Sequence, residues 1–351
     1  MRKIYSFILV GTGGMGKNWC RVTLPPLIHA GRIEPAAAVD INPEALLNAQ
    51  EYLGLSPAQC YTSMQEAFDR VRADFTIIVT PPAFHERVVD LALAHDMDIL
   101  SEKPIADSMD ASVRVLKKVQ RAGKRMGITM SHRFDADKTT FREILNSGRL
   151  GRLDYIVTRF TCANRKFGDW GVFRYQIPNP LLIEGSVHHL DILRSFADDD
   201  CARLYARTWN PPWGEFAGDS CALVTMDMLH GVKCFYEGAK TNARTLNCWE
   251  DEYFRAECEF GTMILDRRRI QILVEGQDPE DVPLAVRPNW RNPWLAEMFV
   301  DWLDGGAPME TRVEDNIQAA ALVFGAIESA RRGQPIDIQN YLQEKLEAVR
   351  V

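Results

Sequence analysis

Short apolar runs alternate with stretches of helical spacing over residues 1–131. Candidate strands lie at 4–10, 36–39, 75–79, 98–101 and 125–131, and the continuous apolar run at 75–79 is typical of a strand buried in a parallel sheet. Helical spacing covers 45–53, 63–71, 85–95 and 108–122 between them. Alternating units of this length predict an α/β domain with a doubly wound parallel sheet.

The pattern changes to a period of two after residue 153. Candidate strands lie at 153–162, 202–209, 220–229, 232–239, 253–260 and 270–274, and helical spacing returns at 181–196, 293–304 and 313–331. We therefore expect a second α/β domain, residues 132–351, with an open, largely antiparallel sheet. We also expect the helix at about 313–331 to pack back on the first domain. Broad, partly apolar sheet faces favour a homo-oligomer.

A glycine-rich loop, Val-Gly-Thr-Gly-Gly-Met-Gly at 10–16, directly follows the first apolar run. In such a G-x-G-x-x-G loop, Gly11 permits a tight turn and Gly13 lets the backbone approach a pyrophosphate. Gly16 lets the next helix pack close to the sheet. The N-terminus of that helix presents free N–H groups to phosphates. The context predicts a dinucleotide-binding Rossmann domain, in which Gly14 and Met15 complete the loop.

Asp40 ends the second apolar run and bears on which dinucleotide binds. A carboxylate there accepts hydrogen bonds from the ribose hydroxyls and repels a 2′-phosphate. Ile41 and Asn42 supply no cation that would neutralise such a phosphate. We therefore expect NAD in preference to NADP. The alternative is that Asp40 only caps the turn into the helix beginning near Pro43.

Further chemistry gathers at the carboxyl ends of the predicted strands, where ligands bind on such sheets. Thr80-Pro81 follows one strand, and Glu102-Lys103-Pro104 follows the next. Burial and a nearby cofactor cation both lower the proton affinity of a lysine, so Lys103 is a candidate general base. The alternative is an ordinary surface charge. His85 either belongs to the site or only starts the helix after Pro82.

The predicted helix at 181–196 carries Glu184, His188 and Asp191 at i, i+4 and i+7, on one face. Acids beside an imidazole are unfavourable in a core and useful in a cleft, so we interpret this face, with the neighbouring His189, as functional. A lone helical histidine is more often structural. Glu184 and His188 have a spacing that a metal can use, but no third ligand is evident, and we expect no metal.

The loop before this helix combines cations with aromatic residues: Arg165, Lys166 and Arg174 lie near Trp170 and Phe173. Aromatic rings suit sugar faces, and cations suit an anionic substituent such as a carboxylate. The alternative is that these cations are simply solvated. We expect Trp170, Arg174 and His189 to contact the substrate.

The composition is that of an ordinary globular protein of 351 residues, and the net charge of −7 argues against nucleic acid and anionic membranes as partners. Eight cysteines lack any C-x-x-C pair, which indicates buried thiols in a reducing compartment and neither a disulfide framework nor a zinc site. The first apolar run is too short for a signal peptide, and no segment suits a membrane span. We therefore expect a cytoplasmic protein. The cysteines are Cys20, Cys60, Cys162, Cys201, Cys221, Cys234, Cys248 and Cys258.

Taken together, these motifs resemble the glucose–fructose oxidoreductase / inositol dehydrogenase / rhizopine-catabolism (Gfo/Idh/MocA) family. The shared elements are Gly-Thr-Gly-Gly-Met-Gly at 11–16, Thr80-Pro81, His85, Glu102-Lys103-Pro104 and the helix from Glu184 to Asp191. The resemblance implies a Rossmann domain followed by an α/β domain, and NAD(P)-dependent chemistry on a sugar or cyclitol hydroxyl. It assigns Lys103 and His188 the family's catalytic lysine and histidine roles, with Glu184 beside them.

The resemblance, with the motifs above, also defines the expected cofactor site. Its residues are Gly11, Gly13, Gly14, Met15, Gly16, Asp40, Thr80, Pro81, His85, Glu102 and Lys103, with Glu102 on the nicotinamide ribose. Two departures affect substrate contacts borrowed from inositol-dehydrogenase-like members. Those members have Asp at the position of Glu184, and the glycine cluster before it is replaced by Ile-Pro-Asn-Pro at 177–180.

Three functions are compatible with these residues. The first is an NAD-dependent oxidoreductase acting on a secondary hydroxyl of a sugar, sugar acid or inositol. The second is redox-neutral glycoside cleavage, in which NAD transiently oxidises a sugar hydroxyl, elimination breaks the glycosidic bond and the hydride returns. The third is a catalytically silent dinucleotide sensor, against which Lys103, His188 and Glu184 argue, because a sensor needs no base. Fold does not choose between the first two.

Overall fold

A computed structural model describes residues 3–351, which form two compact units. The first unit contains the chain up to Ser131 together with 289–317 and 348–351, and the second contains 132–288 and 318–347. The sequence-based boundary lies at the same residue, but 289–317 and 348–351, expected in the second domain, group with the first unit. The helix at 313–332 begins in the first unit and continues in the second.

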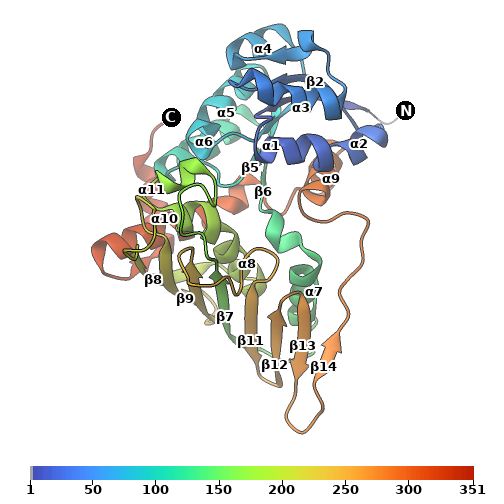
Figure 1. Cartoon of the computed structure of the whole chain (residues 1–351). Coiled ribbons are helices and arrows are strands. Elements are labelled where there is room, and N and C mark those ends of the chain that lie inside the picture. The colour runs from blue at the N-terminus through green and yellow to red at the C-terminus, as the bar shows by residue number, and fades with distance from the viewer. Residues whose placement is uncertain (1–2) are drawn as a thin grey trace. The chain divides into compact units, whose positions relative to one another are not determined.

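The first unit is built on six parallel strands in the order β3-β2-β1-β4-β5-β6, with helices on both faces (Figure 1). This is the doubly wound sheet that the alternating pattern predicts, and that prediction is confirmed. The strands are β1 (Tyr5–Val10), β2 (Ile33–Val39), β3 (Cys60–Tyr61), β4 (Phe75–Ile78), β5 (Asp98–Glu102) and β6 (Met126–Thr129). The helices are α1 (Met15–Asn18), α2 (Pro25–His29), α3 (Pro43–Leu53), α4 (Met64–Arg70), α5 (His85–Ala94), α6 (Met109–Ala122) and α9 (Arg291–Leu303).

The core of this unit lies on both sides of β1 and β4, whose side chains are almost all buried. Phe75 on β4 contacts Phe7 on β1 and Phe299 on α9, with ring centroids 5.6 and 5.5 Å apart. Each such buried aromatic side chain contributes about 1.5–3 kcal/mol of hydrophobic stabilisation. Residues 289–317 therefore complete the core of the first unit, although they follow the second in the chain.

The helix after the glycine loop is not continuous. After α1, residues Trp19–Thr23 form a π-helical turn, and α2 then starts at Pro25. Pro25 and Pro26 have no backbone N–H, so they begin a helical segment well but do not continue one. Trp19, the first residue of the π-helical turn, is fully buried.

The second unit contains nine strands in the order β14-β13-β12-β11-β7-β10-β9-β8-β15. Every pair is antiparallel except β7 with β10, so the expected open, largely antiparallel sheet is confirmed. The strands are β7 (Leu153–Thr161), β8 (Cys201–Trp209), β9 (Cys221–Met228), β10 (Lys233–Ala239), β11 (Tyr253–Cys258), β12 (Gly261–Asp266), β13 (Arg269–Leu273), β14 (Glu280–Val282) and β15 (Ile336–Asp337). Of these, β12, β14 and β15 were not expected.

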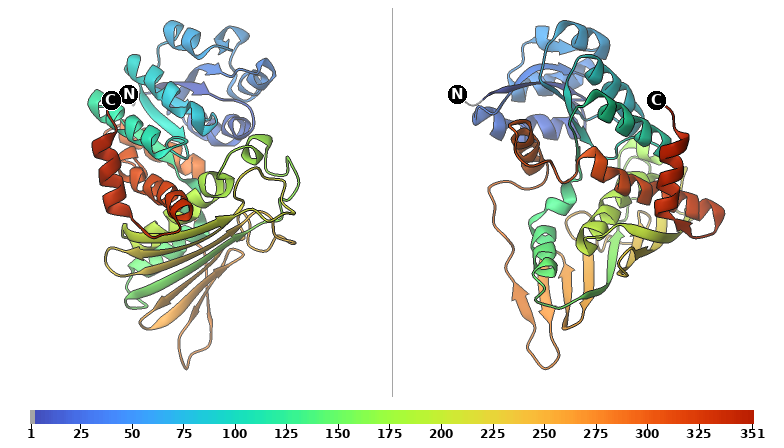
Figure 2. Two further views of the ribbon diagram at one scale, coloured as in Figure 1. Left: turned by 90° about the vertical axis from the view of Figure 1, so that its left-hand side faces the viewer. Right: turned by 180° about the vertical axis from the view of Figure 1, so that it is seen from behind.

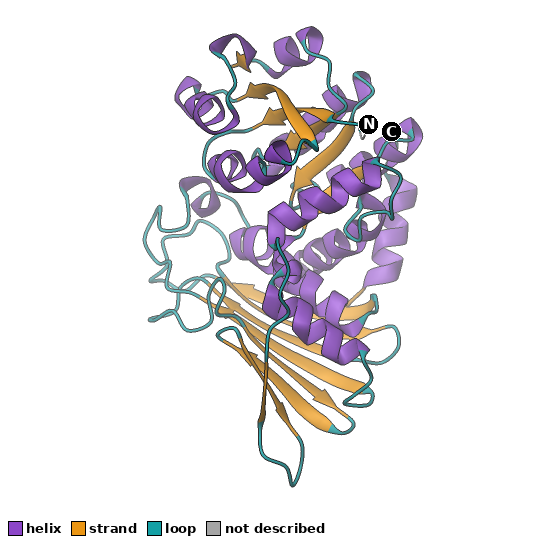
Figure 3. Ribbon diagram, turned by 90° about the vertical axis from the view of Figure 1, so that its right-hand side faces the viewer, coloured by secondary structure: helices purple, strands orange, loops and turns teal. Residues whose placement is uncertain are grey.

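Within residues 3–351, the helices of the second unit lie on one face of this sheet, and the other, bare face carries no helix (Figures 2 and 3). They are α7 (Ala136–Asn146), α8 (Val187–Ala197), α10 (Val313–Arg332, from residue 318 onward) and α11 (Ile338–Ala348). Burial alternates along β9 and β10: Val224 and Tyr236 are buried, whereas Leu223 and Phe235 are 49% and 40% exposed. A period of two with one covered face is what such a sheet requires.

One expectation about the cysteines is wrong, because Cys162 and Cys248 form a disulfide. Cys162 directly follows β7, and a backbone bridge between Thr161 and Asn247 brings the two cysteines together across 86 residues of chain. Spacing in the sequence does not reveal a pairing that depends on the tertiary fold. The remaining cysteines are free.

Within residues 3–351, no helix is long and apolar enough to cross a membrane. The same residues contain no group of three or more histidine, cysteine, aspartate or glutamate side chains that could hold a metal ion.

Candidate active site

The glycine loop of the first unit has little room for side chains where the backbone turns. Gly11 has a φ of +97°, and a Cβ there would collide with the carbonyl of Val79. A Cβ on Gly16 would collide with the carbonyl of Gly11. The space in front of Gly14 is open, with no atom within 4 Å of a Cβ built there. The loop therefore holds its turn by close backbone packing and keeps an open side above Gly14.

Asp40 is bound to this loop by hydrogen bonds. Its Oδ2 accepts from the backbone N–H groups of Thr12 and Gly13 at 2.8 and 3.1 Å. Its other oxygen, Oδ1, accepts from the backbone N–H of Asn42 at 2.9 Å, so Asp40 also caps the turn that leads into α3. The N-cap of α3 itself is Asn42, whose side chain accepts from the backbone N–H of Glu44 at 3.0 Å. Asp40 thus places a negative charge directly against the glycine loop, where the ribose of a dinucleotide lies in Rossmann domains.

The Glu102-Lys103-Pro104 segment lies at the carboxyl end of β5 and is braced by its neighbours in the first unit. Glu102 Oε1 accepts from Trp19 Nε1 at 2.8 Å and from Asn292 Nδ2 at 3.0 Å. The Lys103–Pro104 peptide bond is cis. Asn292 comes from α9, so its contribution was not visible in the local sequence. These contacts hold Glu102, the last residue of β5, and thereby fix the backbone position at which Lys103 follows the strand.

His85 lies inside the first unit and is fully buried. Its Nδ1 is 2.9 Å from the carbonyl oxygen of Pro104, and its Nε2 is 2.8 Å from the carbonyl oxygen of Thr80. Burial lowers the pKa of His85, although the facing carbonyls act in the opposite direction. His85 therefore ties the end of β4 to the loop after β5, and its ring nitrogens face protein carbonyls.

The site in this unit fits a dinucleotide. Thr80 Oγ1 is buried, and within residues 3–351 it has no hydrogen-bond partner. A hydroxyl left without a partner beside a glycine loop is a group that a bound nucleotide can satisfy. Met15, at the first position of α1, is 57% exposed, so the N-terminus of that helix is open on its outer side.

The predicted histidine helix of the second unit has two parts: residues Leu181–Ser186 form a π-helical turn, and α8 begins at Val187. Glu184, His188 and Asp191 are all buried, at 3%, 5% and 0% exposure. Arg174 compensates the charge of Glu184, because its Nε and Nη2 each lie 3.0 Å from Glu184 Oε2. Asp191 has Arg133 at 3.4 Å. The buried carboxylates are thus paired, as burial requires.

Arg174 also lies against the aromatic residues of its own loop. Its guanidinium is 5.1 Å from the Trp170 ring centroid and 4.5 Å from that of Phe173. Nη1 donates to the carbonyl of Trp170 at 3.1 Å. The structure brings the predicted residues Arg174, Trp170 and Glu184 together in one cluster.

His189 points into the interior and is fully buried. Its ring stacks on Phe160 with centroids 4.2 Å apart, and its Nδ1 is 3.2 Å from the carbonyl of Gly185 on its own helix. Its Nε2 lies 3.6 Å from Oε1 of Glu252. Burial lowers the pKa of His189, which keeps the ring neutral in this environment. His189 therefore packs in the core of the second unit.

His188 is accompanied by residues that the sequence did not single out. The ring of His132 lies 4.4 Å from that of His188, and the indole of Trp249 lies 4.9 Å from His132 and 5.9 Å from His188. His132 Nδ1 is 3.5 Å from Oε1 of Glu252, which is 1% exposed. His132 follows β6, at the carboxyl edge where polar residues of such sheets gather, and that position is the signal that could have found it.

Lys138 balances the charge of Glu252 in the interior of the second unit. Burial by itself would raise the pKa of Glu252, but Lys138 and the neighbouring histidines hold it well below its usual range. Burial likewise acts to lower the pKa of Lys138, but Glu252, Asp137 and Asp135 raise it to about 12. Both groups are therefore charged near neutral pH.

A second buried lysine, Lys240, lies beside the disulfide. Its Nζ donates to Cys162 Sγ at 3.3 Å and lies 4.1 Å from the Trp170 ring centroid and 4.7 Å from that of Trp249. Every second residue of β10 from Cys234 onward faces the interior, and Lys240 occupies the next position of that series. This period of two is the feature of the sequence that could have predicted its burial.

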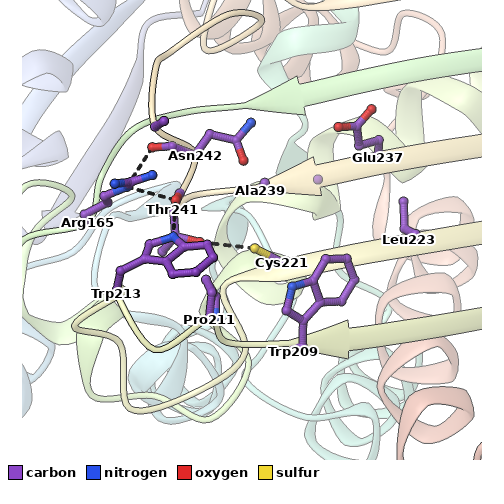
Figure 4. A pocket seen from close by; sticks show the side chains of 12 residues that line it. Arg165, Trp209, Pro211, Trp213, Cys221, Leu223, Glu237, Ala239, Thr241 and Asn242 are labelled. Carbon is purple, nitrogen blue, oxygen red and sulfur yellow. Dashed lines mark hydrogen bonds between the residues drawn. The ribbon is translucent and has the colours of Figure 1, made fainter.

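A separate hollow of about 480 Å³ lies at the end of β8, β9 and β10 (Figure 4). Trp209 and Trp213 line it, and Arg165 closes one side by donating to the carbonyls of Thr241 and Asn242 at 3.0 and 2.9 Å. None of the predicted site residues lines this hollow. Arg165, one of the loop cations noted in the sequence, is thus occupied by backbone carbonyls.

The comparisons with known proteins agree with this architecture. The NAD-binding Rossmann fold of the Gfo/Idh/MocA oxidoreductase family matches residues 5–130, and the C-terminal alpha/beta domain of that family matches 142–338. An uncharacterised protein from Sinorhizobium fredii, y4oX, is 46% identical over 350 residues, which are 97% of this chain and 97% of that protein. Inositol 2-dehydrogenase 1 from Paenarthrobacter aurescens is 28% identical over 214 residues, 60% of this chain and 59% of that protein.

A solved structure extends the likeness to the whole fold. An oxidoreductase from Agrobacterium radiobacter, in complex with NAD+, L-tartaric acid and magnesium, has a TM-score of 0.81. The match covers 97% of this chain and 100% of that one at 20% identity, so it supports the fold alone.

The fold and the glycine loop define an NAD-binding oxidoreductase. The chain belongs to the Gfo/Idh/MocA family, with NAD as its cofactor.

Proposed function

We propose that this protein is an NAD-dependent dehydrogenase that oxidises or reduces a secondary hydroxyl of a sugar, sugar acid or inositol. The observation that carries the proposal is the position of Lys103 at the carboxyl end of β5 in an NAD-binding sheet. Ligands of such sheets lie at the carboxyl ends of the strands. The loop that holds Lys103 is braced by His85 and by the partners of Glu102.

Oxidation of an alcohol needs a base for the O–H proton and an acceptor for the hydride, and bound NAD supplies that acceptor. Lys103 and His188 are the proposed groups that hold and move the proton. Glu184, neutralised by Arg174, is proposed to orient the substrate hydroxyl.

Trp170 and Arg174 are proposed to contact the substrate. An aromatic face beside a guanidinium suits the C–H face of a sugar together with an anionic or hydroxyl substituent. His189, fully buried on Phe160, is instead proposed to support α8 from the inside. The inositol dehydrogenase relative supports a polyol as substrate, and the pair Arg174–Glu184 supports one that bears several hydroxyls.

The test is an assay of the purified protein with NAD or NADP against free sugars, sugar acids, inositols and aryl glycosides. Nicotinamide absorbance and released aglycone are read together. NADH production from a free sugar or polyol supports the dehydrogenase. Aglycone release that requires NAD but leaves no NADH overturns it in favour of redox-neutral cleavage.

Two variants then assign the residues. Lys103→Met and His188→Asn are expected to lower kcat by about a hundredfold or more, because general acid–base catalysis supplies about that much. Binding of NAD, measured by fluorescence titration, is expected to persist in His188→Asn. Lys124→Met, at a lysine paired with Asp96 near the surface of the first unit, is the control. Full activity in both catalytic variants excludes the assigned roles.

We propose further that the protein is a homodimer or homotetramer that pairs through the bare face of its sheet. Leu223 and Phe235 support this association, since exposed apolar side chains on adjacent strands favour it. Light scattering after size exclusion tests it, with Phe235→Lys as the disrupting variant. A monomeric mass for the wild-type protein contradicts it.

A further inference from the structure

The second unit contains a buried polar cluster that the proposed proton-transfer roles do not use. Glu252 lies just before β11, and its two carboxylate oxygens have different partners. Oε2 is 2.9 Å from Lys138 Nζ, whereas Oε1 is 3.5 Å from His132 Nδ1 and 3.6 Å from His189 Nε2. One oxygen therefore satisfies a buried cation, and the other faces two imidazole rings.

His132 connects this carboxylate to His188. It is in contact with Glu252 at Nδ1, and its ring lies 4.4 Å from the ring of His188, inclined by 47°. Trp249 packs against His132 at 4.9 Å and against His188 at 5.9 Å, so the two imidazoles share one aromatic neighbour. Within residues 3–351 neither His132 Nδ1 nor Glu252 Oε1 has a hydrogen bond, so at 3.5 Å the carboxylate acts on His132 through its charge, which favours the tautomer with a proton on Nδ1.

We propose that Glu252 and His132 are positioning residues for His188: the carboxylate fixes His132, and His132 fixes the ring and the proton affinity of His188. This inference rests on the proposed function, in which His188 handles the proton of the substrate hydroxyl. Glu252 and His132 would then take part in the reaction only through their effect on His188.

The electrostatic surroundings decide the sign of the effect. Glu252 is the carboxylate within contact of His132, and its charge favours protonated imidazole nearby. The charged and titratable groups beside the cluster come from several elements. Asp135, Asp137 and Lys138 lie at α7, His189 lies on α8, Arg268 lies between β12 and β13, and Lys240 follows β10 with its ammonium 4.7 Å from the Trp249 ring centroid. Removing the charge of Glu252 should therefore weaken proton binding at the neighbouring histidines.

The experiment compares Glu252→Gln and His132→Phe with a matched control, Asp137→Asn. Asp137 also pairs with Lys138, at 3.2 Å, in a fully buried setting, but within residues 3–351 it forms no ion pair with a histidine. Glu252→Gln and His132→Phe are expected to lower kcat by about ten- to hundredfold, a part of what general acid–base catalysis supplies. KM should change little.

The pH profile is the readout that a purely structural role would not move. In Glu252→Gln the acid limb of kcat/KM should shift to lower pH, because the negative charge that favours protonation is gone. Glu252→Asp keeps the charge and should retain most of the wild-type profile. Asp137→Asn should keep it as well. The proposal is overturned if folded Glu252→Gln and His132→Phe keep the wild-type kcat and the wild-type pH profile of kcat/KM. It is also overturned if the acid limb shifts by the same amount in Asp137→Asn as in Glu252→Gln.

A second measurement does not depend on turnover. The ring ¹⁵N signals of His188 are recorded in the free protein and assigned by their loss in His188→Asn. They should move in Glu252→Gln and His132→Phe and stay in place in Asp137→Asn. If Glu252→Gln does not fold, the His188 signals of His132→Phe test the coupling by themselves. That variant is expected to fold because phenylalanine keeps an aromatic ring at the position of His132. Wild-type protein without dehydrogenase activity rejects the proposed function, whereas unmoved His188 signals reject the coupling.

Discussion

Lys138 and Glu252 form an ion pair of 2.9 Å in the interior of the second unit, with side chains that are 1% and 0% exposed. Asp137 lies 3.2 Å and Asp135 3.7 Å from the same ammonium. The pair joins α7 to the segment that leads into β11. Because neither group can reach water in the folded state, each depends on the other for compensation of its charge.

Replacing Lys138 by methionine should lower the free energy of unfolding by about 3–5 kcal/mol, because it leaves uncompensated buried carboxylates. Urea denaturation followed by circular dichroism measures the change. Lys118→Met is the control, since Lys118 pairs with Glu86 and Asp90 in a partly exposed setting where such pairs contribute about 0–1 kcal/mol. Equal losses in the two variants would show that burial does not matter here.

The same pair predicts a pH dependence of stability. The pKa of Glu252 is held well below its ordinary value of 4.5, so its contribution is present above that pH and is lost as the pH falls through the folded value. The pKa of Lys138 is raised from 10.5 to about 12, so its contribution is complete below 10.5 and is lost as the pH rises toward 12. Urea midpoints measured from neutral pH into acid should fall less steeply in Glu252→Gln than in the wild type. Parallel curves would contradict the assignment.

Substitution of two glycines of the loop by alanine should affect two different properties, the stability of the fold and the affinity for NAD. Gly16→Ala places a Cβ on the carbonyl of Gly11 and should lower stability by at least about 1–3 kcal/mol. Gly13→Ala meets only Ala45 Cβ at 3.5 Å and Asp40 Oδ2 at 3.8 Å, so it should fold normally but bind NAD more weakly. Thermal unfolding and NAD titration separate the two effects. Unchanged NAD affinity in Gly13→Ala would remove Gly13 from the phosphate site.

Asp40 should control the choice between NAD and NADP. Asp40→Ser removes charge-assisted hydrogen bonds of the kind that contribute about 1.5–3 kcal/mol, so KM for NAD should rise about tenfold or more. Adding Ile41→Arg, at a side chain that is 85% exposed, should bring NADP into use. The ratio of kcat/KM for the two cofactors is the measurement. Glu44→Ser, at a nearby acid on α3, should leave that ratio unchanged, and a similar change there would exclude a specific role for Asp40.

The disulfide should stabilise the second unit. Cys248→Ser opens a link across 86 residues and should lower the free energy of unfolding by about 2–4 kcal/mol under oxidising conditions. Cys258→Ser, at a free and partly buried cysteine, is the matched control. Under strong reductant the wild type and Cys248→Ser should converge. A wild type that is insensitive to reductant would show that the link is not formed in solution.

The architecture of both units could be predicted from the chain because its signals are local. Continuous apolar runs such as Phe75–Ile78 mark buried parallel strands, and alternation along Cys221–Met228 marks a sheet with one covered face. The glycine loop and Glu102-Lys103-Pro104 are recognisable because turn chemistry depends on neighbouring residues. β12 escaped prediction because Gly261–Asp266 is short and directly follows a strand through a tight turn.

What only the tertiary structure decided is which distant residues meet. Asn292 reaches Glu102 across 190 residues, Cys248 reaches Cys162 across 86, and Glu252 reaches Lys138 across 114. The sequence determined the classes of element, the NAD loop and the candidates Lys103 and His188. The surroundings of His188 depend on loops folded back against α7 and α8. Such contacts follow from packing and charge compensation across the whole unit, and no periodicity along the chain encodes them.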